Sequence, residues 1–371
     1  MFGNARICQT LVVPLSSKKS TPSPKKPTSL KELAAYLGFS PATVSLVINR
    51  SPVANAIPQR TKDQIIAAAK KFNYRPNLLA KSLRTRRSFI VGVIVPEVSE
   101  GYEAAVLSGI EDHLLEEDYF YFVASHRHRN DLIEKYAQLF LDRNIDGLIA
   151  VDTPWNRKFD PPVVTISGNH SRPGITKVKL DHNKAAELAL GHLQQLGHKA
   201  IAVIKGQKFS SDTDVRWNSI TRAADKLGIK IPAKFVVQLA GASPTPEVGY
   251  RATKKLLAST SGGFTALFAF NDISAIGAIQ ALREAGIRVP EDVSVMGFDD
   301  IQSAAYQNPG LTTVRQPLRK MGETAAEILL KRIRKPDMKT PDFIVVEPEL
   351  VVRGTTAAAS GARARSTHYK D

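Results

Sequence analysis

Two hydrophobic patterns divide the chain. From residue 29 to about residue 75, apolar positions recur every three or four residues, which predicts short amphipathic helices. From residue 88 onward, short apolar runs alternate with stretches of helical spacing. The runs are FIVGVIV, YFYFVAS, IDGLIAV, PVVTIS, KAIAVI, KFVVQL, TALFAF and VSVMGF, and the helical stretches cover 102–116, 131–144, 183–196, 247–259 and 272–285. This alternation predicts a parallel, doubly wound α/β architecture, with enough strands for two sheets, two lobes and a cleft between them.

The N-terminal pattern predicts a small helical unit. In TSLKELAAYLGFSPATVSLVINRSP, Ser29 and Glu32 have the spacing of a capping box, and Gly38 follows the first helix. Ser40 and Pro41 suit the start of a second helix. A third helix is expected from Thr61 to Asn73, with the inward positions Ile65, Ala69 and Phe72. Two short helices joined by a glycine-containing turn indicate a helix-turn-helix, although a generic three-helix bundle fits this pattern equally well.

The second helix carries two apolar stripes. Val44 and Ile48 lie one turn apart and can face a core, whereas Ala42 and Leu46 point to nearly the opposite side. The polar residues between the stripes are Thr43, Ser45 and Asn49. A second apolar stripe on so short a helix needs a partner outside the core.

The distribution of charge suggests that partner. The net charge is +16, and residues 1–87 contain 16 Lys and Arg but only 2 Asp and Glu, so this quarter of the chain alone carries +14. A basic head on a nearly neutral body favours DNA over a generic bundle. In a helix-turn-helix, the second helix lies in the major groove. Ala42 and Leu46 are then expected on thymine methyl groups, and Thr43, Ser45 and Asn49 on phosphates or base edges.

Several motifs in one order resemble the lactose/galactose-repressor (LacI/GalR) family of bacterial transcription regulators. They include ATVSLVIN, NYRPNLLAKSL, GHLQQLGHKAIAVI, FAFNDISAIGAIQALREAGIRVPEDVSVMGFDD and NPGLTTVRQPLRKMGETAAEILL, and the resemblance covers residues 28–355. It implies an N-terminal all-α helix-turn-helix domain followed by an α/β two-lobed periplasmic-binding-protein-like domain with doubly wound parallel sheets. The expected parts are a disordered basic tail (1–27), the DNA-binding domain (28–75), a hinge helix and linker (76–87), the two-lobed effector-binding and dimerisation domain (88–355) and a disordered tail (356–371).

The resemblance also assigns roles to particular residues. Asn77–Arg84 matches a hinge helix in which Leu83 is expected to enter the minor groove and kink the operator. Ser29, Ser40 and Asn77 complete the residues expected at DNA. Residues 88–182 with 315–335 are expected to form one lobe, and residues 183–314 with 336–355 the other.

Ligands of open α/β sheets bind beyond the carboxyl ends of the strands. This rule selects PEVSEGYE (96–103), GQKFSSDTDVR (206–216), Asn271–Asp272 and GFDD (297–300). By the resemblance, Arg216 and Asp299 match positions where the family holds its small-molecule effector. Tyr102, Asp212 and Asn271 are further residues expected at the effector. Arg216 also fits a salt-bridged helix residue, and Asn271 also fits a helix cap.

Other function classes find little support. Phosphate-binding, nucleophile-elbow and metal-ligand motifs are not found in the sequence, so we expect no enzyme, no cofactor and no metal. The two histidines of SHRHRN (125–130) suggest an exposed loop rather than a metal pair. A periplasmic-type sugar-binding protein without a DNA role is the alternative, but it would need a signal peptide and would not carry residues 28–87. The single cysteine and the lack of an apolar run long enough for a bilayer favour the cytoplasm and its nucleoid.

The expected function is therefore a transcriptional regulator, most simply a repressor. Its expected partners are a near-palindromic double-stranded operator DNA, a second copy of the chain in a homodimer, and a small effector, in the first instance a carbohydrate. The segment KFSSDTD (208–214) is unusually polar and acidic, so no one ligand of the family can be carried over to this chain.

Overall fold

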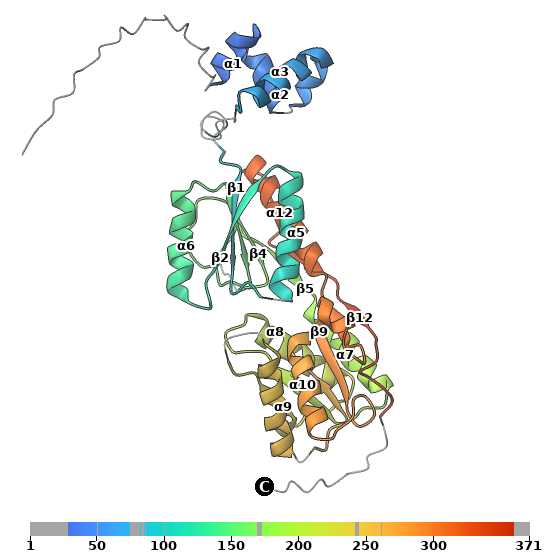
Figure 1. The fold of residues 1–371 in the computed structure, drawn as a ribbon. Coiled ribbons are helices and arrows are strands. Elements are labelled where there is room, and N and C mark those ends of the chain that lie inside the picture. Colours follow the sequence, from blue (N-terminus) through green and yellow to red (C-terminus); the bar gives the residue numbers. More distant parts are fainter. Residues whose placement is uncertain are drawn as a thin grey trace, which may run out of the picture. The chain divides into compact units, whose positions relative to one another are not determined.

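A computed structural model describes residues 29–49, 51–74, 82, 85, 87–99, 101–168, 173–241, 245–260 and 262–359 (Figure 1). The chain divides into two compact units, a head that ends at Thr85 and a body that begins at Arg86. The predicted tail 1–27 and the predicted hinge residues Asn77 and Leu83 lie outside the described residues.

The head contains the predicted helices α1 (Leu30–Leu37), α2 (Pro41–Ile48) and α3 (Gln59–Lys71), with a 3-10 turn η1 (Pro52–Ala56) between the last two. The capping box is present, because Ser29 Oγ accepts from the Glu32 amide while the Glu32 carboxylate accepts from the Ser29 amide. Gly38 ends α1 in the left-handed conformation, with φ of 69°. The third helix begins at Gln59, two residues before the predicted start.

The core of the head differs from the prediction in one turn of α2. Its buried residues are Leu33, Ala34, Val44, Val47, Ala54, Ile65 and Ala68. Val47, three positions after Val44, takes the inward place predicted for Ile48, which is only partly buried. Ala69 and Phe72 of the third helix are also only partly buried. Both i+3 and i+4 neighbours share a helix face, so sequence spacing alone could not decide between Val47 and Ile48.

The body contains two six-stranded sheets, one in each lobe. The first has the order β11-β5-β4-β3-β1-β2 and the second the order β12-β10-β9-β8-β6-β7. The strands of the first sheet are β1 (Ile90–Val95), β2 (Phe120–Ser125), β3 (Gly147–Val151), β4 (Val163–Ile166), β5 (Thr176–Leu180) and β11 (Phe343–Val346). Those of the second are β6 (Ile201–Lys205), β7 (Val236–Gln238), β8 (Ala266–Phe268), β9 (Ser294–Asp299), β10 (Thr312–Arg315) and β12 (Glu349–Val351). All pairs are parallel except β10 with β12, so the predicted doubly wound architecture is confirmed.

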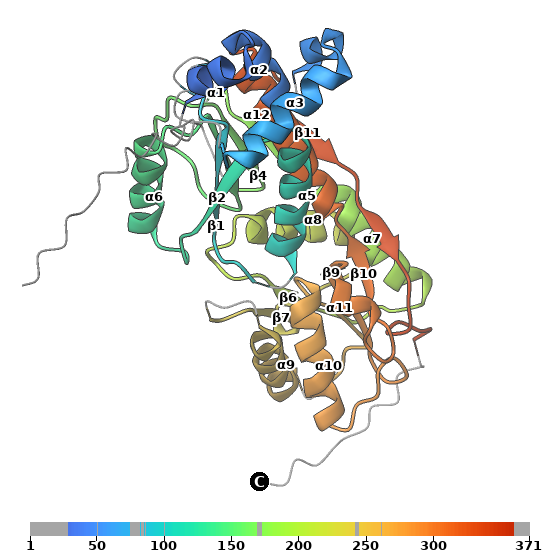
Figure 2. The ribbon, with the colours of Figure 1, turned by 45° about the horizontal axis from the view of Figure 1, so that its top comes forward.

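Helices cover both faces of each sheet. In the first lobe, α6 (Asn130–Asp142) packs on one face and α5 (Tyr102–Glu116) with α12 (Leu318–Arg334) on the other, as Figures 1 and 2 show. In the second lobe, α9 (Pro246–Thr260) and α10 (Asp272–Glu284) share one core, while α7 (His182–Gln195) and α8 (Asp212–Lys226) share another. Two short elements complete this lobe, η2 (Ala233–Phe235) and α11 (Gln302–Ala305).

Two predicted boundaries in the C-terminal part are wrong. The stretch 336–355 was assigned to the second lobe, but β11 pairs in parallel with β5 and so belongs to the first. Only β12, which pairs with β10, lies in the second sheet. The tail predicted to be disordered from residue 356 is ordered as far as 359: His198 Nε2 lies 3.0 Å from the Ala357 carbonyl oxygen, and the Ala359 amide donates to the Leu196 carbonyl.

Candidate functional site

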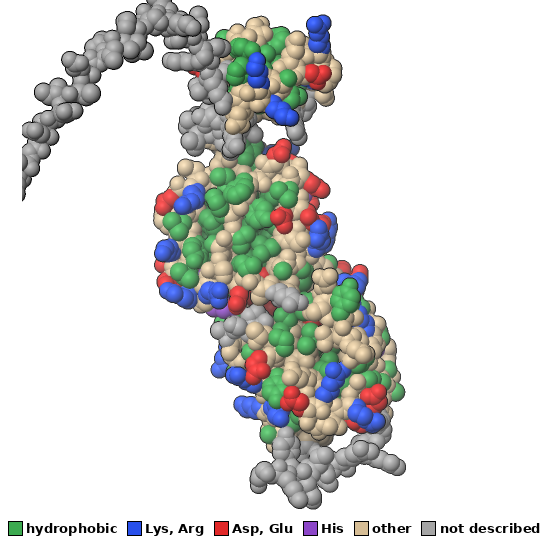
Figure 3. All heavy atoms as spheres, in the orientation of Figure 1, with side chains coloured by type: hydrophobic (Ala, Val, Ile, Leu, Met, Phe, Trp, Pro, Cys, Tyr) green, Lys and Arg blue, Asp and Glu red, His purple; other side chains and the backbone are tan. Residues whose placement is uncertain are grey.

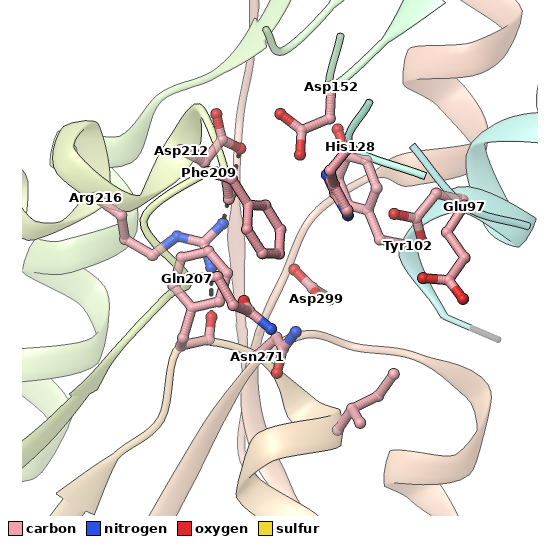
Figure 4. A pocket seen from close by; sticks show the side chains of 14 residues that line it. Glu97, Tyr102, His128, Asp152, Gln207, Phe209, Asp212, Arg216, Asn271 and Asp299 are labelled. Carbon is pink, nitrogen blue, oxygen red and sulfur yellow. Dashed lines mark hydrogen bonds and ion pairs between the residues drawn. The ribbon is translucent and has the colours of Figure 1, made fainter. Parts of the chain in front are cut away.

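All five residues predicted at the effector line one cavity in the body (Figure 4). Its empty space is about 690 Å³, counting the part that is open to solvent. The residues that follow strands β1, β2, β3, β6 and β8 and the last residue of β9 meet here, so both sheets present their carboxyl ends to the cavity. The lining residues are Glu97, Tyr102, Glu103, His128, Asp152, Gln207, Phe209, Ser210, Asp212, Arg216, Phe270, Asn271, Ile273 and Asp299.

Arg216 is a buried cation in the wall of the cavity. It lies on α8, with its guanidinium carbon 3.7 Å from the ring centre of Phe298 and 4.3 Å from that of Phe270. One guanidinium nitrogen donates to the Phe270 carbonyl oxygen, and another lies 3.9 Å from Asp212 Oδ2. Burial lowers the pKa of Arg216, and the charges of Asp299 and Asp212 act against that shift. Arg216 therefore matches both alternatives from the sequence: it forms a salt bridge along its helix, and it also lines the cavity.

Asp212 is held as a carboxylate. It accepts a hydrogen bond from Ser167 Oγ at 3.2 Å, and His182 Nε2 lies 3.7 Å from Oδ2. Burial alone raises the pKa of Asp212, but the charges of His182, Arg216 and Lys177 outweigh it and bring the pKa below the usual range. This residue starts α8, a helix that is not among the helical stretches predicted from the sequence.

Asp299 is the last residue of β9 and has a φ of 111°, a region rarely occupied by residues other than glycine. Its Oδ1 accepts from Gln316 Nε2 at 2.6 Å, and the side chain is buried. Burial raises the pKa of Asp299 to about 7, although Arg216 lowers it in part. A strained backbone that presents a buried carboxyl group to a cavity is typical of functional sites.

The first lobe contributes Tyr102 and Asp152. The Tyr102 hydroxyl donates to Ser167 Oγ at 3.1 Å, and burial together with Asp212 and Asp152 raises the pKa of this tyrosine well above its usual range. Asp152 accepts a hydrogen bond from Ser211 Oγ of the second lobe. Burial and the charge of Asp212 raise the pKa of Asp152 to about 7.

The segment SHRHRN differs from the predicted exposed loop. His126 is buried, and its Nε2 lies 3.0 Å from Thr153 Oγ1, while burial lowers the pKa of His126 to about 4. His128 lines the cavity and contacts Phe209 of the second lobe, with ring centres 3.9 Å apart and the ring planes tilted by 36°. Metal-ligating groups of three or more His, Cys, Asp or Glu are not found among the described residues.

Asn271 has two roles in the structure. Its side chain accepts from the Ser274 amide and so caps α10, as the alternative prediction held, and it also lines the cavity. The neighbouring Asp272 is fully buried behind the cavity, where it accepts from Thr313 Oγ1 and the Ile301 amide.

Several lining residues were not singled out from the sequence. Glu97, Glu103, Gln207 and Phe209 lie inside the quoted stretches 96–103 and 206–216, so the strand-end rule had located them without ranking them. Asp152 directly follows β3 and was available to the same rule. His128 follows the predicted strand at 119–125 and was available to the rule as well, but its contact with Phe209 across the lobes could not be predicted from spacing.

The described residues that were predicted at DNA lie on α2 or at helix ends: Ser29 caps α1, and Ser40 and Asn49 flank α2. Ala42 is exposed, as expected for a surface stripe, but Leu46 is only half-exposed and packs in part against the head core. Ser40 Oγ caps α2 by accepting from the Thr43 amide and lies 2.9 Å from Thr43 Oγ1. Asn49 Nδ2 donates to the Ser45 carbonyl at 2.8 Å. Thr43, Ser45 and Asn49 remain at least partly exposed, so this face is polar around two apolar side chains.

Comparisons with known proteins agree with this division. Residues 29–77 match the model of bacterial regulatory proteins of the lacI family, and residues 190–356 match a periplasmic binding protein-like domain. The HTH-type transcriptional repressor PurR of Haemophilus influenzae is 31% identical over 337 residues, which is 88% of this chain and 97% of that protein. The chain belongs to the lacI family. The predicted DNA-binding transcriptional regulator under the control of a small-molecule effector is thereby confirmed.

Solved structures place this lacI-family chain in the same group. The Lac repressor dimer bound to operator and an anti-inducer superposes with a TM-score of 0.76 at 25% identity, covering 90% of this chain and all of that one. The transcriptional regulator CelR in complex with cellobiose gives a TM-score of 0.65 at 26% identity, covering 89% of this chain and all of that one. In the described part of the chain, the helices are all too short or too polar to cross a bilayer.

Proposed function

We propose that the effector binds in the cavity between the two lobes and that its binding changes the affinity of the head for operator DNA. One observation carries this proposal: five residues chosen from the sequence, on both lobes, line one cavity at the strand ends. A ligand held there touches both lobes at once, so its affinity depends on how the lobes are arranged. It can therefore shift the equilibrium between lobe arrangements.

The contacts that link the lobes support a two-state body. Ser167 of the first lobe donates to Asp212 of the second, and Ser211 of the second donates to Asp152 of the first. The Gly168 amide also donates to Ser211 Oγ at 3.0 Å. These few polar contacts border the cavity, so a ligand in the cavity competes with them or adds to them.

On the DNA side, we propose that α2 enters the major groove. Ala42 and Leu46 face thymine methyl groups there, and Thr43, Ser45 and Asn49 contact phosphates or base edges. The net charge of +14 on residues 1–87 supplies the attraction to phosphates. The similar Lac repressor dimer is bound to operator DNA, which supports DNA binding by this chain.

A homodimer on a near-palindromic operator completes the proposal. β2 is an edge strand of the first sheet, and exposed large hydrophobic residues lie on it and at the end of α5, namely Leu115, Phe120 and Val123. Figure 3 shows hydrophobic side chains gathered on one face of this lobe. Exposed apolar patches of this kind mark association surfaces, and the Lac repressor neighbour is a dimer. We place the working protein in the cytoplasm, on the nucleoid, and we assign the cavity to binding rather than catalysis because the relatives are regulators.

Mobility-shift assays with genomic fragments, followed by an effector screen on the bound complex, test the proposal. Arg216→Ala and Phe209→Ala should abolish the response to the effector while leaving operator binding without effector nearly unchanged. The matched control is Asp337→Asn, a change at an exposed position after α12, which should respond like the parent protein. If both cavity variants respond to the effector like the parent, the assignment of the cavity is wrong.

A further inference from the structure

The walls of the cavity carry unequal numbers of opposite charges. Among the described lining residues, five are carboxylic acids, namely Glu97, Glu103, Asp152, Asp212 and Asp299, and one, Arg216, is a Lys or Arg. The lining His128 does not alter this balance at neutral pH, because burial lowers its pKa. The excess of acids over bases is far larger than in the body as a whole, which is nearly neutral.

The positive groups are concentrated around one of these acids. Asp212 has Arg216, His182 and Lys177 close enough to stabilise its charge. Glu97 forms an ion pair with Arg127, whose Nη1 lies 3.7 Å from Glu97 Oε1. That arginine is largely exposed to solvent, which screens the pair. The remaining acids are thus left with little positive charge nearby.

Three carboxyl groups receive neutral donors instead. Asp152 accepts from Ser211, Glu103 from Ser99 at 3.2 Å, and Asp299 from the amide of Gln316. Arg216 offsets part of the Asp299 charge from a distance. Asp299 is 6% exposed and its second oxygen, Oδ2, has no hydrogen-bond partner among the described residues. In Figure 4 this carboxyl group lies between Arg216 on one side and Tyr102 and Glu97 on the other.

Aromatic rings line the same space. Phe209 contacts His128 at a tilt and is still 46% exposed, and Tyr102 lines the same cavity. The faces of such rings attract cations, the more so in a site partly removed from water. A hydroxyl group can donate to one of the carboxylates but leaves its charge in place, whereas a protonated amine donates up to three hydrogen bonds and also neutralises a charge.

We propose that the effector of this protein carries a protonated amine, bound by Asp299, Asp152 and Glu103 beside the rings of Phe209 and Tyr102. This inference rests on the proposed function, since it names the chemistry of the ligand at the same cavity. An amino sugar satisfies both this chemistry and the carbohydrate expected from the family resemblance, and a cationic aromatic amine satisfies the stacking equally well.

Matched pairs of probes that differ in one group test the inference on the full-length chain. Glucosamine is compared with glucose, putrescine with 1,4-butanediol, and 2-phenylethylamine with 2-phenylethanol, by thermal shift and isothermal titration calorimetry at pH 7. At least one amine should bind in the millimolar range or better, and about tenfold or more tighter than its neutral partner. Its binding should release protons, seen as a heat that depends on the buffer, because a nearby cation lowers the pKa values of Asp152 and Asp299 from about 7.

Variants show whether the preference comes from these carboxyl groups. Asp299→Asn and Asp152→Asn should weaken amine binding about tenfold or more and change binding of a neutral probe by less than about threefold. Asp337→Asn is again the control, since its exposed carboxylate should matter for neither probe. Loss of amine preference in either cavity variant, with the control unchanged, supports the inference.

Two outcomes overturn the inference: neutral partners that bind as tightly as the amines, or no binding by any amine in the millimolar range. If a neutral probe binds and Arg216→Ala removes it, the cavity remains the effector site and only the amine is rejected. If an effector from the screen acts undiminished on Arg216→Ala and Phe209→Ala, the proposed function itself fails.

Discussion

Ser211 of the second lobe donates a hydrogen bond to the carboxyl group of Asp152 in the first lobe. Asp152 follows β3 and Ser211 precedes α8, so residues 59 positions apart in the sequence join the two lobes at the rim of the cavity. The same hydroxyl accepts from the Gly168 amide. This serine therefore links two loops of one lobe to the first turn of a helix in the other.

Removing this hydroxyl should weaken the lobe arrangement seen here. Ser211→Ala deletes the hydrogen bond to the ionisable carboxyl group of Asp152. We therefore expect the affinity for the effector to fall about tenfold, or about 1.4 kcal/mol. Isothermal titration calorimetry measures the affinity, and small-angle scattering of the body reports any opening. Thr221→Ala on the same helix is the control, because its hydroxyl bonds within α8, to the Asn218 carbonyl. An unchanged affinity in Ser211→Ala would show that the contact does not couple the lobes.

The buried carboxyl group of Asp299 should make stability depend on pH. Its pKa is raised from 3.8 to about 7, so between these values the folded chain holds a proton that the unfolded chain has lost. The contribution of Asp299 to stability is thus fully present below about pH 4 and is lost as the pH rises through about 7. The amide in Asp299→Asn does not titrate, so this pH dependence is absent from the variant. Its free energy of unfolding should therefore rise relative to that of the parent as the pH increases over this window. Urea unfolding at a series of pH values measures the difference.

Asp337→Asn serves as the control for that titration, because the parent and this surface variant should run in parallel across the window. If the free energy of unfolding of Asp299→Asn minus that of the parent stays constant or falls from about pH 4 to about pH 8, a raised pKa for Asp299 is contradicted.

The fold was largely predictable because most elements carry a local pattern. The helix expected at 102–116 has those bounds, and each predicted apolar run contains a strand. α8 was missed because its first turn, with Asp212 and Asp214, is polar and shows no apolar spacing. β11 was assigned to the wrong lobe because its partner β5 lies more than 160 residues away, and pairing at that separation leaves no trace in a local pattern.

The candidate site was predictable in position but not in chemistry. The strand-end rule and the family resemblance together located five lining residues, since both depend on the order of strands and motifs along the chain. The charges on those residues follow from burial and from neighbours across the lobes. The strand-end rule could bring Asp152 and Asp299 to one edge, but no spacing in the sequence indicated that Arg216 would lie against Phe270 and Phe298.

Close helix packing in the second lobe should not tolerate a methyl group at Gly277. A Cβ atom there would lie 1.8 Å from the Pro246 carbonyl oxygen, so α9 and α10 would have to separate. We expect Gly277→Ala to lower the free energy of unfolding by about 1–3 kcal/mol. Gly191→Ala on α7 is the matched control: a Cβ there meets nothing within 4 Å, so the better helix former should stabilise the chain by about 0.5–1 kcal/mol. Chemical denaturation of both variants checks the prediction, and equal effects would contradict it.

Operator affinity should fall steeply with salt. The head, residues 1–85, contains 14 Lys and Arg and 2 Asp and Glu, a net charge of +12, and each phosphate contact that it makes releases a condensed counterion. For a dimer with about 6–10 phosphate contacts, the affinity should drop about 10³- to 10⁵-fold between about 50 and 200 mM salt. Fluorescence anisotropy with a labelled operator measures the slope, which should be shallower for Lys62→Gln in the head and unchanged for Lys230→Gln in the body. An operator affinity that hardly changes with salt concentration would mean that the head makes few phosphate contacts.

Leu46 should read a thymine methyl group even though it also packs against the head core. Because of this double role, Leu46→Ala should lower both the melting temperature of the free protein and its operator affinity, and neither loss alone identifies a DNA contact.

A double-mutant cycle that combines Leu46→Ala with modified DNA separates the two effects. Replacing the facing thymine by uracil removes only the methyl group, so it should weaken the parent protein by about 1 kcal/mol, near the lower end of the cost of a mismatched base pair. The same replacement should hardly affect Leu46→Ala, since the partner side chain is already gone. Ala42→Ser provides a second arm at an exposed position of the same helix, where the melting temperature should stay constant. If uracil weakens the parent and Leu46→Ala by the same amount, the leucine serves the core of the head alone and the methyl group is read by another residue.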